Sequence, residues 1–312
     1  MSAATSGTAP PKPPKNLLAL VGPTGAGKSE LAVLIAERID AEILCVDAYQ
    51  VYRGMAVLTA QPDSGLRARV KHHLYGEFSP HEVLDAAIFA RRAQAVMDDA
   101  TTRGVPILLV GGSGLYLRAL LGGFDPLPPV DAELRAALRE LGLTELLRRL
   151  ADADPHALET VDAQNPRRVQ RALEIVLQTG LPLSASRKRG KQFRVVHHGW
   201  LAARSREELR LRIETNVARM FEEGVIEEVR QLGTIGETAS RAIGWQHIHQ
   251  ILAGRLTPEE ACVRIVADTR AYAKRQLTWF RNQTSYPEVT LTGSLPPSGF
   301  VESVADLVLG AP

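Results

Sequence analysis

A glycine-rich stretch near the start of the chain places the strongest limit on its fold. Residues 22–29 read GPTGAGKS, which has the spacing G-x-x-x-x-G-K-[ST] of a phosphate-binding loop. An apolar run, NLLALV at 16–21, precedes it, and 28–39 follow with apolar residues at helical spacing. A buried strand, this loop and a helix, in that order, predict a P-loop rather than a chance glycine turn.

The loop predicts a pyrophosphate-like ligand. Backbone N–H groups around Gly25 and Gly27, the start of the next helix and the Lys28 ammonium all favour such an anion. The Ser29 hydroxyl stands where Mg²⁺ usually binds. None of these groups recognises adenine, so ATP does not follow from the loop. The predicted diphosphate-binding residues are Gly22, Pro23, Thr24, Gly25, Ala26, Gly27, Lys28 and Ser29.

Strand and helix patterns alternate after the loop. Apolar runs predict further strands at 42–46, 105–110 and 195–202. Helices are expected at 82–103, just after 114, at 206–232 and at 258–281. This order predicts an α/β fold with a P-loop NTPase-like parallel sheet flanked by helices. Ligands of such sheets bind at the carboxyl ends of the strands, where the loops at Gly22, Asp47 and Gly111 begin.

The character of the chain changes near residue 125. FDPLPPVD at 124–131 is rich in proline and typical of a linker, and residues 131–180 read as short amphipathic helices. We therefore expect an all-helical insertion domain at 126–194. It would interrupt a core domain made of 16–125 and 195–295. The ends, 1–15 and 296–312, are expected to be tails, and the first is rich enough in Pro, Ser, Thr and Ala to be disordered.

Basic residues are unevenly distributed, although the formal net charge is only +2. Between Gln164 and Arg194 there are eight basic residues and one acidic residue, Glu174. The predicted helix at 264–281 carries five basic residues, with Trp279 and Phe280 among them. One such block is often only a solvated helix face, but two blocks with aromatic neighbours favour nucleic-acid binding.

Cysteine content and hydropathy indicate in which cellular compartment the protein is expected. Cys45 and Cys262 are the only cysteines and form no C-x-x-C pair, which disfavours a zinc ribbon and a disulfide scaffold. No apolar stretch reaches the roughly 18 residues that span a bilayer. We therefore expect a cytoplasmic protein that does not contact membranes. The adjacent His72 and His73 point apart and predict no metal site.

Polar residues follow two predicted strands at the ligand-binding edge. Asp47 follows the strand at 42–46, where a carboxylate organises Mg²⁺, acts as a general base, or merely caps a turn. Gln50 has an amide that suits an adenine edge. Ser113, in GGSG, offers a hydroxyl or belongs to a plain turn. No aspartate follows the strand at 105–110, which disfavours a motor, a GTPase or a helicase but not a small-molecule kinase.

The ordered motifs of the chain resemble those of one family. GPTGAGKS, DAYQVYRGM, KHHL, LLVGGSGLYLRALL, NPRRVQRALEI, SRAIGWQ and TRAYAKRQLTWFRN resemble the bacterial tRNA dimethylallyltransferases, also called tRNA isopentenyl transferases. The resemblance covers about 16 to 290. It implies a monomer that uses Mg²⁺ to move a dimethylallyl group from dimethylallyl diphosphate to tRNA. The acceptor would be N6 of the adenosine 3′ of the anticodon in tRNAs that read codons beginning with U.

The resemblance also implies roles for single residues. Asp47 matches the general base, Ser113 matches a threonine near the reacting centre, and Arg212 matches an arginine that grips the diphosphate. Ser29 would bind Mg²⁺, with Asp47 contributing through water. The tRNA-binding residues implied are Asp47, Ala48, Tyr49, Gln50, Ser113, Arg135, Arg167, Arg168, Val169, Gln170, Arg171, Arg241, Ala242, Ile243, Gly244, Trp245 and Gln246.

Four departures from the family pattern bear on donor affinity and base activation. Ala48 stands in place of serine, Leu58 of glycine, Gln61 of lysine and Asn216 of arginine.

Three alternatives remain open. A prenyl transferase acting on free adenine nucleotides would share the P-loop and Asp47 but would not need the basic insertion. A small-molecule P-loop kinase would need an arginine-bearing lid. An RNA-binding protein with a relic P-loop is disfavoured by the intact Lys28, Ser29 and Asp47.

Overall fold

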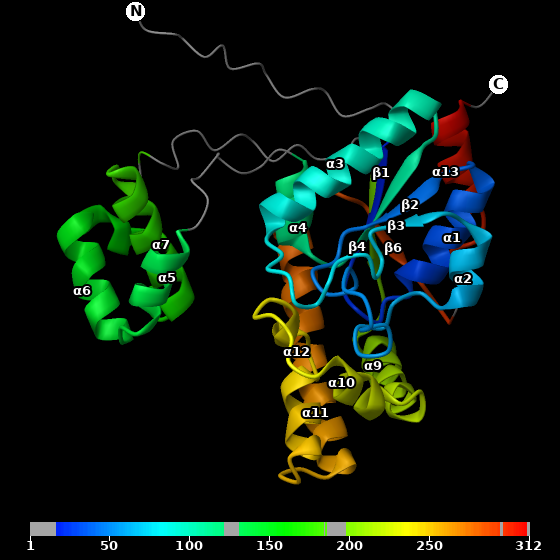
Figure 1. Cartoon of the computed structure of the whole chain (residues 1–312). Coiled ribbons are helices and arrows are strands. Elements are labelled where there is room, and N and C mark those ends of the chain that lie inside the picture. Colours follow the sequence, from blue (N-terminus) through cyan, green and yellow to red (C-terminus); the bar gives the residue numbers. More distant parts are fainter. Residues whose placement is uncertain (1–16, 122–130, 184, 186–197, 294–295, 311–312) are drawn as a thin grey trace, which may run out of the picture. The chain divides into compact units, whose positions relative to one another are not determined.

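A six-stranded parallel sheet forms the centre of the larger unit in this computed structural model (Figure 1). The strand order is β3-β2-β4-β1-β5-β6, and every pair is parallel. The strands are β1 (Leu17–Val21), β2 (Glu42–Cys45), β3 (His72–His73), β4 (Ile107–Gly111), β5 (His198–Ala203) and β6 (Glu288–Thr290). The sheet agrees with the predicted α/β class.

The structure describes residues 17–121, 131–183, 185, 198–293 and 296–310. The predicted N-terminal tail at 1–15, most of the linker at 124–131 and the basic residues between 187 and 194 lie outside the described residues. No helix within the described ranges is long and apolar enough to cross a membrane.

Helices cover both faces of the sheet (Figure 1). Helices α3 and α4 pack together, and α1 packs with α2 and α13. The helices of this unit are α1 (Lys28–Arg38), α2 (Ser64–Arg69), α3 (Ala86–Arg103), α4 (Gly114–Leu120), α9 (Arg206–Glu222), α10 (Val225–Leu232), α11 (Trp245–Leu252), α12 (Pro258–Gln283) and α13 (Phe300–Leu309), with a short 3₁₀ turn, η2 (Ala239–Arg241). Strands β1, β2 and β4 are buried along their whole length, as expected of a parallel sheet covered on both sides.

Strand register brings three loops together. Strand β4 lies between β1 and β2, with Val21 opposite Gly111 and Cys45 opposite Val110. The segments that leave these strands are the P-loop, the turn at Asp47 and the turn at Gly112. The predicted ligand-binding edge is therefore formed by neighbouring strands.

Several elements differ from the sequence prediction. Strands β3 and β6 and helices α2 and α11 were not predicted. The helix expected at 206–232 is two helices, because Gly224 adopts φ +87° between them. The segment expected to be a C-terminal tail, 296–312, contains α13, whose Phe300 packs edge-to-face on Trp200 of β5.

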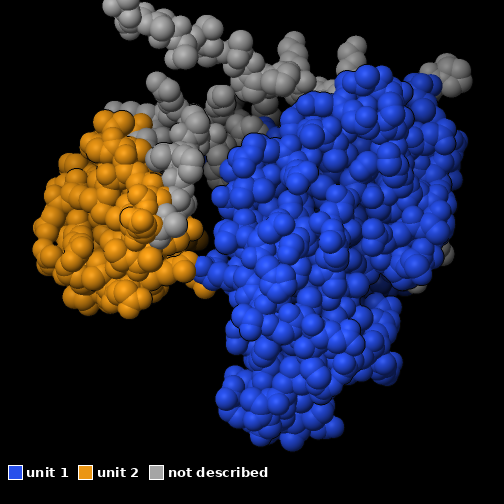
Figure 2. Space-filling view, in the orientation of Figure 1, with its two compact units in different colours: residues 1–121, 194–312 blue, residues 122–193 orange. Residues whose placement is uncertain are grey.

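The chain divides into two compact units, shown in different colours in Figure 2: residues 1–121 with 194–312, and residues 122–193. The smaller unit contains α5 (Ala132–Arg139), α6 (Leu143–Ala153), a 3₁₀ turn η1 (Pro155–Glu159) and α7 (Pro166–Thr179). Its own core includes Leu150, Val169 and Leu173, which are fully buried. The smaller unit thus has the separate hydrophobic core that defines a domain.

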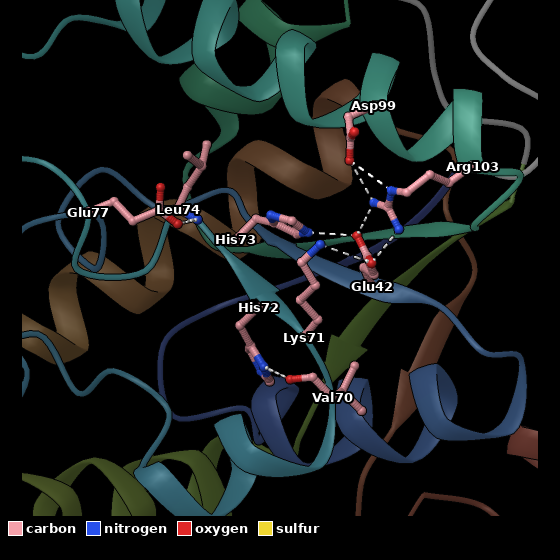
Figure 3. Close-up of polar contacts among 9 residues, drawn as sticks. All are labelled: Glu42, Val70, Lys71, His72, His73, Leu74, Glu77, Asp99 and Arg103. Atoms are coloured by element: carbon pink, nitrogen blue, oxygen red, sulfur yellow. Dashed lines mark hydrogen bonds and ion pairs between the residues drawn. The ribbon is translucent and has the colours of Figure 1, made fainter.

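A buried carboxylate ties β2, β3 and α3 together at the amino end of the sheet (Figure 3). Glu42 accepts two hydrogen bonds of 2.7 Å from Arg103, one of 2.8 Å from His73 and one of 3.3 Å from Lys71. The Arg103 bonds are the main reason that the pKa of Glu42 is lowered to about 2.

We expect Glu42→Gln to lower the free energy of unfolding at pH 7 by about 2 kcal/mol, because a charge-assisted bidentate pair is lost. The folded pKa lies below the unfolded value near 4.5, so this stability is complete above pH 4.5 and is lost as pH falls toward 2. Urea unfolding across that range measures the difference. Glu302→Gln, an exposed change on α13, is the control. A wild-type advantage that persists at pH 2 would contradict this origin.

Candidate active site

One pocket lies at the carboxyl edge of the sheet and is built from the larger unit alone. Parts of the P-loop, the turn at Asp47 and the segment 56–63 line it. Helices α9 and α12 close it with Arg212 and Asn216, and with Tyr272 and Gln276. The pocket therefore joins the predicted diphosphate loop and the predicted base.

The P-loop has the backbone that its glycines predict. Gly25 and Gly27 adopt φ +79° and +90°, which residues with a Cβ rarely adopt. The Lys28 ammonium turns back onto the loop and donates to the Pro23 carbonyl at 2.8 Å. Burial lowers the pKa of Lys28 to about 8, although the Asp47 carboxylate opposes the shift. Because burial disfavours the charged form of Lys28, a bound anion stabilises that form strongly.

Diphosphate binding should depend on pH through Lys28. A bound anion raises the pKa of Lys28 above 8, so the complex takes up a proton when it forms near or above that pH. We expect inorganic pyrophosphate to bind more weakly as pH rises through 8. Calorimetry in buffers of different ionisation enthalpy measures the uptake. Pyrophosphate binding without proton exchange at pH 8.5 would contradict proton uptake by Lys28.

The Asp47 carboxylate stabilises a turn and also lies in surroundings that suit proton transfer. Its Oδ1 accepts from the N–H groups of Tyr49 at 2.9 Å and Gln50 at 3.3 Å, so the Asx turn considered from sequence is present. Burial nevertheless raises the pKa of Asp47, against the opposing effects of these N–H groups and Lys28. A partly buried carboxylate with a raised pKa, facing a pocket, is equipped to accept a proton.

The GGSG sequence is more than a plain turn. Ser113 is 7 % exposed, and its Oγ accepts from the Ala48 N–H at 2.9 Å. A Cβ at Gly111 would lie 2.0 Å from the Val46 carbonyl oxygen. A Cβ at Gly114 would lie 2.2 Å from the Trp279 ring. The glycines thus allow β4 to approach the Val46 backbone and α12 to approach the start of α4 closely.

Two arginines reach the P-loop from the segment that follows β5. Arg212 Nε donates to the Gly25 carbonyl at 3.1 Å, and its guanidinium pairs with Glu30 at 3.6 Å. Arg204, which sequence reasoning missed, has a side chain that is 1 % exposed and donates to the Ala26 carbonyl at 2.8 Å. A Cβ at Gly27 would lie 2.9 Å from Arg204 Nη2. Arg204 therefore supports the loop from beneath, whereas Arg212 lines the pocket.

Long polar side chains fix the segment 56–63 on the pocket wall. Gln50 donates its amide to the carbonyls of Thr59 and Ala60 at 3.1 and 2.7 Å. Glu228 of α10 accepts from the N–H groups of Val57 and Leu58, both at 2.8 Å. The Gln50 amide is thus hydrogen-bonded within the protein in this structure. Its predicted contact with adenine stays a prediction.

The segment 241–246, predicted to contact tRNA, meets the same pocket. Ala242 and Ile243 line it, and Gly244, at φ +95°, packs against Leu58. Trp245 is 4 % exposed and its ring packs on His249, so it is a core residue rather than an exposed stacking platform. Arg241 pairs with Glu237. Gln246 follows on α11 and is exposed.

The remaining predicted tRNA contacts belong to the smaller unit. Glu174 is 1 % exposed and accepts from Arg135 at 2.9 Å through both oxygens, and from Gln170 and Arg171 at 3.0 and 3.1 Å. Arg167 and Arg168 precede these residues on α7 and are exposed. Val169 is fully buried in the core of the unit, so its side chain faces away from any RNA.

The oxygen atoms that line the pocket can hold a hard cation only when a bound ligand supplies further oxygen atoms. Ser29 and Asp47 both line the pocket and offer oxygen atoms. Within the described ranges, no group of three or more His, Cys, Asp or Glu side chains is placed to hold a metal ion by itself. His72 and His73, for example, contact the Val70 carbonyl and Glu42. Mg²⁺ commonly takes one or two protein oxygens and completes its shell with phosphate and water, which fits Ser29 and Asp47.

Comparison with known proteins identifies the family of the chain. Residues 50–283 match the family model of the IPP transferases. The tRNA dimethylallyltransferase 2 of Geotalea uraniireducens is 44% identical over 288 residues, covering 87% of this chain and 93% of that protein. The tRNA dimethylallyltransferase of Akkermansia muciniphila is 39% identical, covering 93% and 98%. The crystal structure of a tRNA isopentenylpyrophosphate transferase from Bacillus halodurans has a TM-score of 0.68 and 32% identity, covering 95% and 96%. The chain therefore belongs to the IPP transferase family.

Proposed function

We propose that this enzyme transfers a dimethylallyl group from dimethylallyl diphosphate to N6 of the adenosine 3′ of the anticodon, in tRNAs that read codons beginning with U. The observation that carries the proposal is the single pocket that joins a P-loop to a partly buried Asp47. An anion site and a base are the two groups that such a transfer needs. Because tRNA is the proposed acceptor, the proposed place of action is the cytoplasm.

The donor's diphosphate is the leaving group in this reaction. The bond between the allylic carbon and the diphosphate oxygen breaks, and negative charge grows on that oxygen. Residues of the loop, Lys28 and Arg212 all line the pocket that would hold this diphosphate. Fixed positive groups at the site of developing charge stabilise the transition state because they need no rearrangement. When bound to Ser29, with Asp47 contributing through water, Mg²⁺ would add further positive charge for the diphosphate.

The acceptor nitrogen gains a carbon and loses a proton. The lone pair of an adenine amine is delocalised into the ring, so N6 is a weak nucleophile. Asp47, whose pKa is raised by burial, takes the N6 proton as the new bond forms. The adenine must leave its stack to reach this pocket, so we expect base flipping. Holding N6 in line with the allylic carbon supplies a further part of the rate.

A transfer assay tests the proposal. Purified protein, Mg²⁺ and labelled dimethylallyl diphosphate are mixed with either an anticodon stem-loop bearing adenosines 3′ of the anticodon, or with free AMP. Label in the RNA alone supports the proposal. Label in AMP alone would mean nucleotide prenylation. Label in neither acceptor, with phosphate transfer from ATP instead, would mean a kinase. A stem-loop whose 3′-adjacent adenosine is replaced by guanosine is the matched negative control.

The exposed arginines of α7 should contribute to RNA binding through phosphate contacts. Each phosphate contact changes the slope of log K against log salt by roughly 0.7 to 0.9, so Arg167→Ala with Arg168→Ala should flatten it by about 1 to 2. Filter binding from low to high salt measures the slope. The matched control is Arg148→Ala with Arg149→Ala on α6, two adjacent arginines that pair with Glu145. An unchanged slope for Arg167→Ala with Arg168→Ala would mean that these two arginines face elsewhere.

A further inference from the structure

Helix α12 places one buried amide, that of Gln276, at the carboxyl edge of the sheet. Gln276 is 5 % exposed and lies between two loops. Its Oε1 accepts from the Thr24 N–H of the P-loop at 2.9 Å, and its Nε2 donates to the Gly112 carbonyl at 2.9 Å. We propose that Gln276 is a positioning residue that holds the diphosphate-binding loop and the Asp47 turn at a fixed separation.

Gly112 connects Gln276 to the base. The polar backbone of Gly112 lies near the Asp47 carboxylate and opposes the rise in its pKa. The neighbouring Ser113 accepts from the Ala48 N–H at 2.9 Å and donates its own N–H to the Val46 carbonyl at 3.2 Å. The turn at Gly112 is thus bonded to the residues on both sides of Asp47. A movement of Gly112 moves the carboxylate with it.

The fit between α12 and this turn leaves no spare room. A Cβ at Gly112 would lie 2.2 Å from Gln276 Nε2 and 3.1 Å from the Gly22 carbonyl oxygen. The hydrogen bonds to the Thr24 N–H and the Gly112 carbonyl therefore hold the amide in one orientation. A carboxamide suits this place because it offers one acceptor and one donor.

This inference rests on the proposed transferase function. The P-loop would set the position of the leaving diphosphate, and Asp47 would set that of the acceptor N6. A displacement of about 1 Å between reacting groups can cost about 100-fold in rate. Loss of Gln276 should therefore lower turnover and diphosphate affinity much more than RNA affinity, because the exposed arginines of α7 also contribute to RNA binding.

Gln276→Met tests the idea with a side chain of similar length that makes neither bond. We expect kcat to fall about 10- to 100-fold, since the two loops are no longer coupled. Affinity for inorganic pyrophosphate should fall by about tenfold, because the P-loop backbone at Thr24 is no longer held in one conformation. Gln276→Glu keeps the acceptor but replaces the donor with a second oxygen and adds a negative charge, so it should bind pyrophosphate more weakly still. Gln231→Met, the same exchange at an exposed position of α10, is the control.

A double-mutant cycle separates positioning from folding. Gly112→Ala pushes a methyl group into the space of the amide, whereas Gln276→Ala empties that space. If the two residues act through one contact, Gly112→Ala with Gln276→Ala should be no worse than the more impaired single variant. Additive losses in kcat would overturn the proposal.

Two further outcomes are decisive. Gln276→Met with wild-type kcat and pyrophosphate affinity would overturn the proposal, and so would an equal loss of RNA affinity with a collapsed melting temperature. If the wild-type protein fails to prenylate RNA, the proposed function fails. The pyrophosphate measurement still tests the role of Gln276 in that case.

Discussion

Asp47→Asn is expected to lower kcat for prenyl transfer by about 100- to 10,000-fold, the usual contribution of a positioned base. Asparagine keeps an oxygen that accepts from the N–H groups of Tyr49 and Gln50, so the turn should survive. It has no carboxylate to take the N6 proton. Single-turnover transfer to the stem-loop measures the rate, and RNA affinity should be unchanged.

The chain offers a close control for this change. Asp85 caps α3 by accepting from the N–H groups two and three residues ahead, Ala87 and Ile88, in the same pattern as Asp47. Asp85→Asn should leave transfer at the wild-type rate. A rate for Asp47→Asn as high as that of Asp85→Asn would remove Asp47 from the chemistry and leave it only its turn.

Lys28→Met is expected to lower kcat/KM for the donor by about 100- to 1,000-fold, as is typical when one group that stabilises developing charge is removed. Methionine fills the space of the lysine stem but carries no charge. Steady-state transfer at varied donor concentration measures the effect, and RNA affinity should not change. Lys71→Met, an exposed lysine at the start of β3, is the control. Unchanged inhibition of Lys28→Met by pyrophosphate would contradict the assignment.

The two residues together predict a bell-shaped pH profile for kcat/KM. Asp47 must be ionised, and its raised pKa moves the acid limb above the pH at which an ordinary aspartate titrates. Lys28 must be charged, so the alkaline limb should lie near pH 8. The acid limb should disappear from what remains of the rate in Asp47→Asn, and the alkaline limb in Lys28→Met. A profile that is flat in the wild-type enzyme would contradict both roles.

The parts of the site that sequence reasoning found share one property: their signal is local. The P-loop is eight consecutive residues between a strand and a helix, and Asp47 directly follows a predicted strand. Arg204 and Gln276 carry no such signal. Each is one polar residue among many in its segment, and its partners lie 178 and 252 residues away in sequence. The motif containing Gln276 supported the family resemblance without indicating that this side chain faces the P-loop.

Short elements escaped prediction for a related reason. Strands β3 and β6 have two and three residues, too few to show a period, and exist because each adds to an edge of a larger sheet. Helix α13 lies beyond the family motifs, in the segment 296–312 that was expected to be a tail. Its packing with α1 and its contact with Trp200 make it part of the core unit.

The contact between Thr24 and Gln276 also has a consequence for the order in which the protein becomes active. On the ribosome, the P-loop and Asp47 emerge early, and the smaller unit follows with a core of its own. Arg204, Arg212 and Gln276 are made only after that unit. The diphosphate-binding loop is therefore synthesised long before the residues that fix its conformation. The ability to bind the donor is therefore gained late and in one step. The contacts that complete the site join segments that lie almost the whole length of the chain apart.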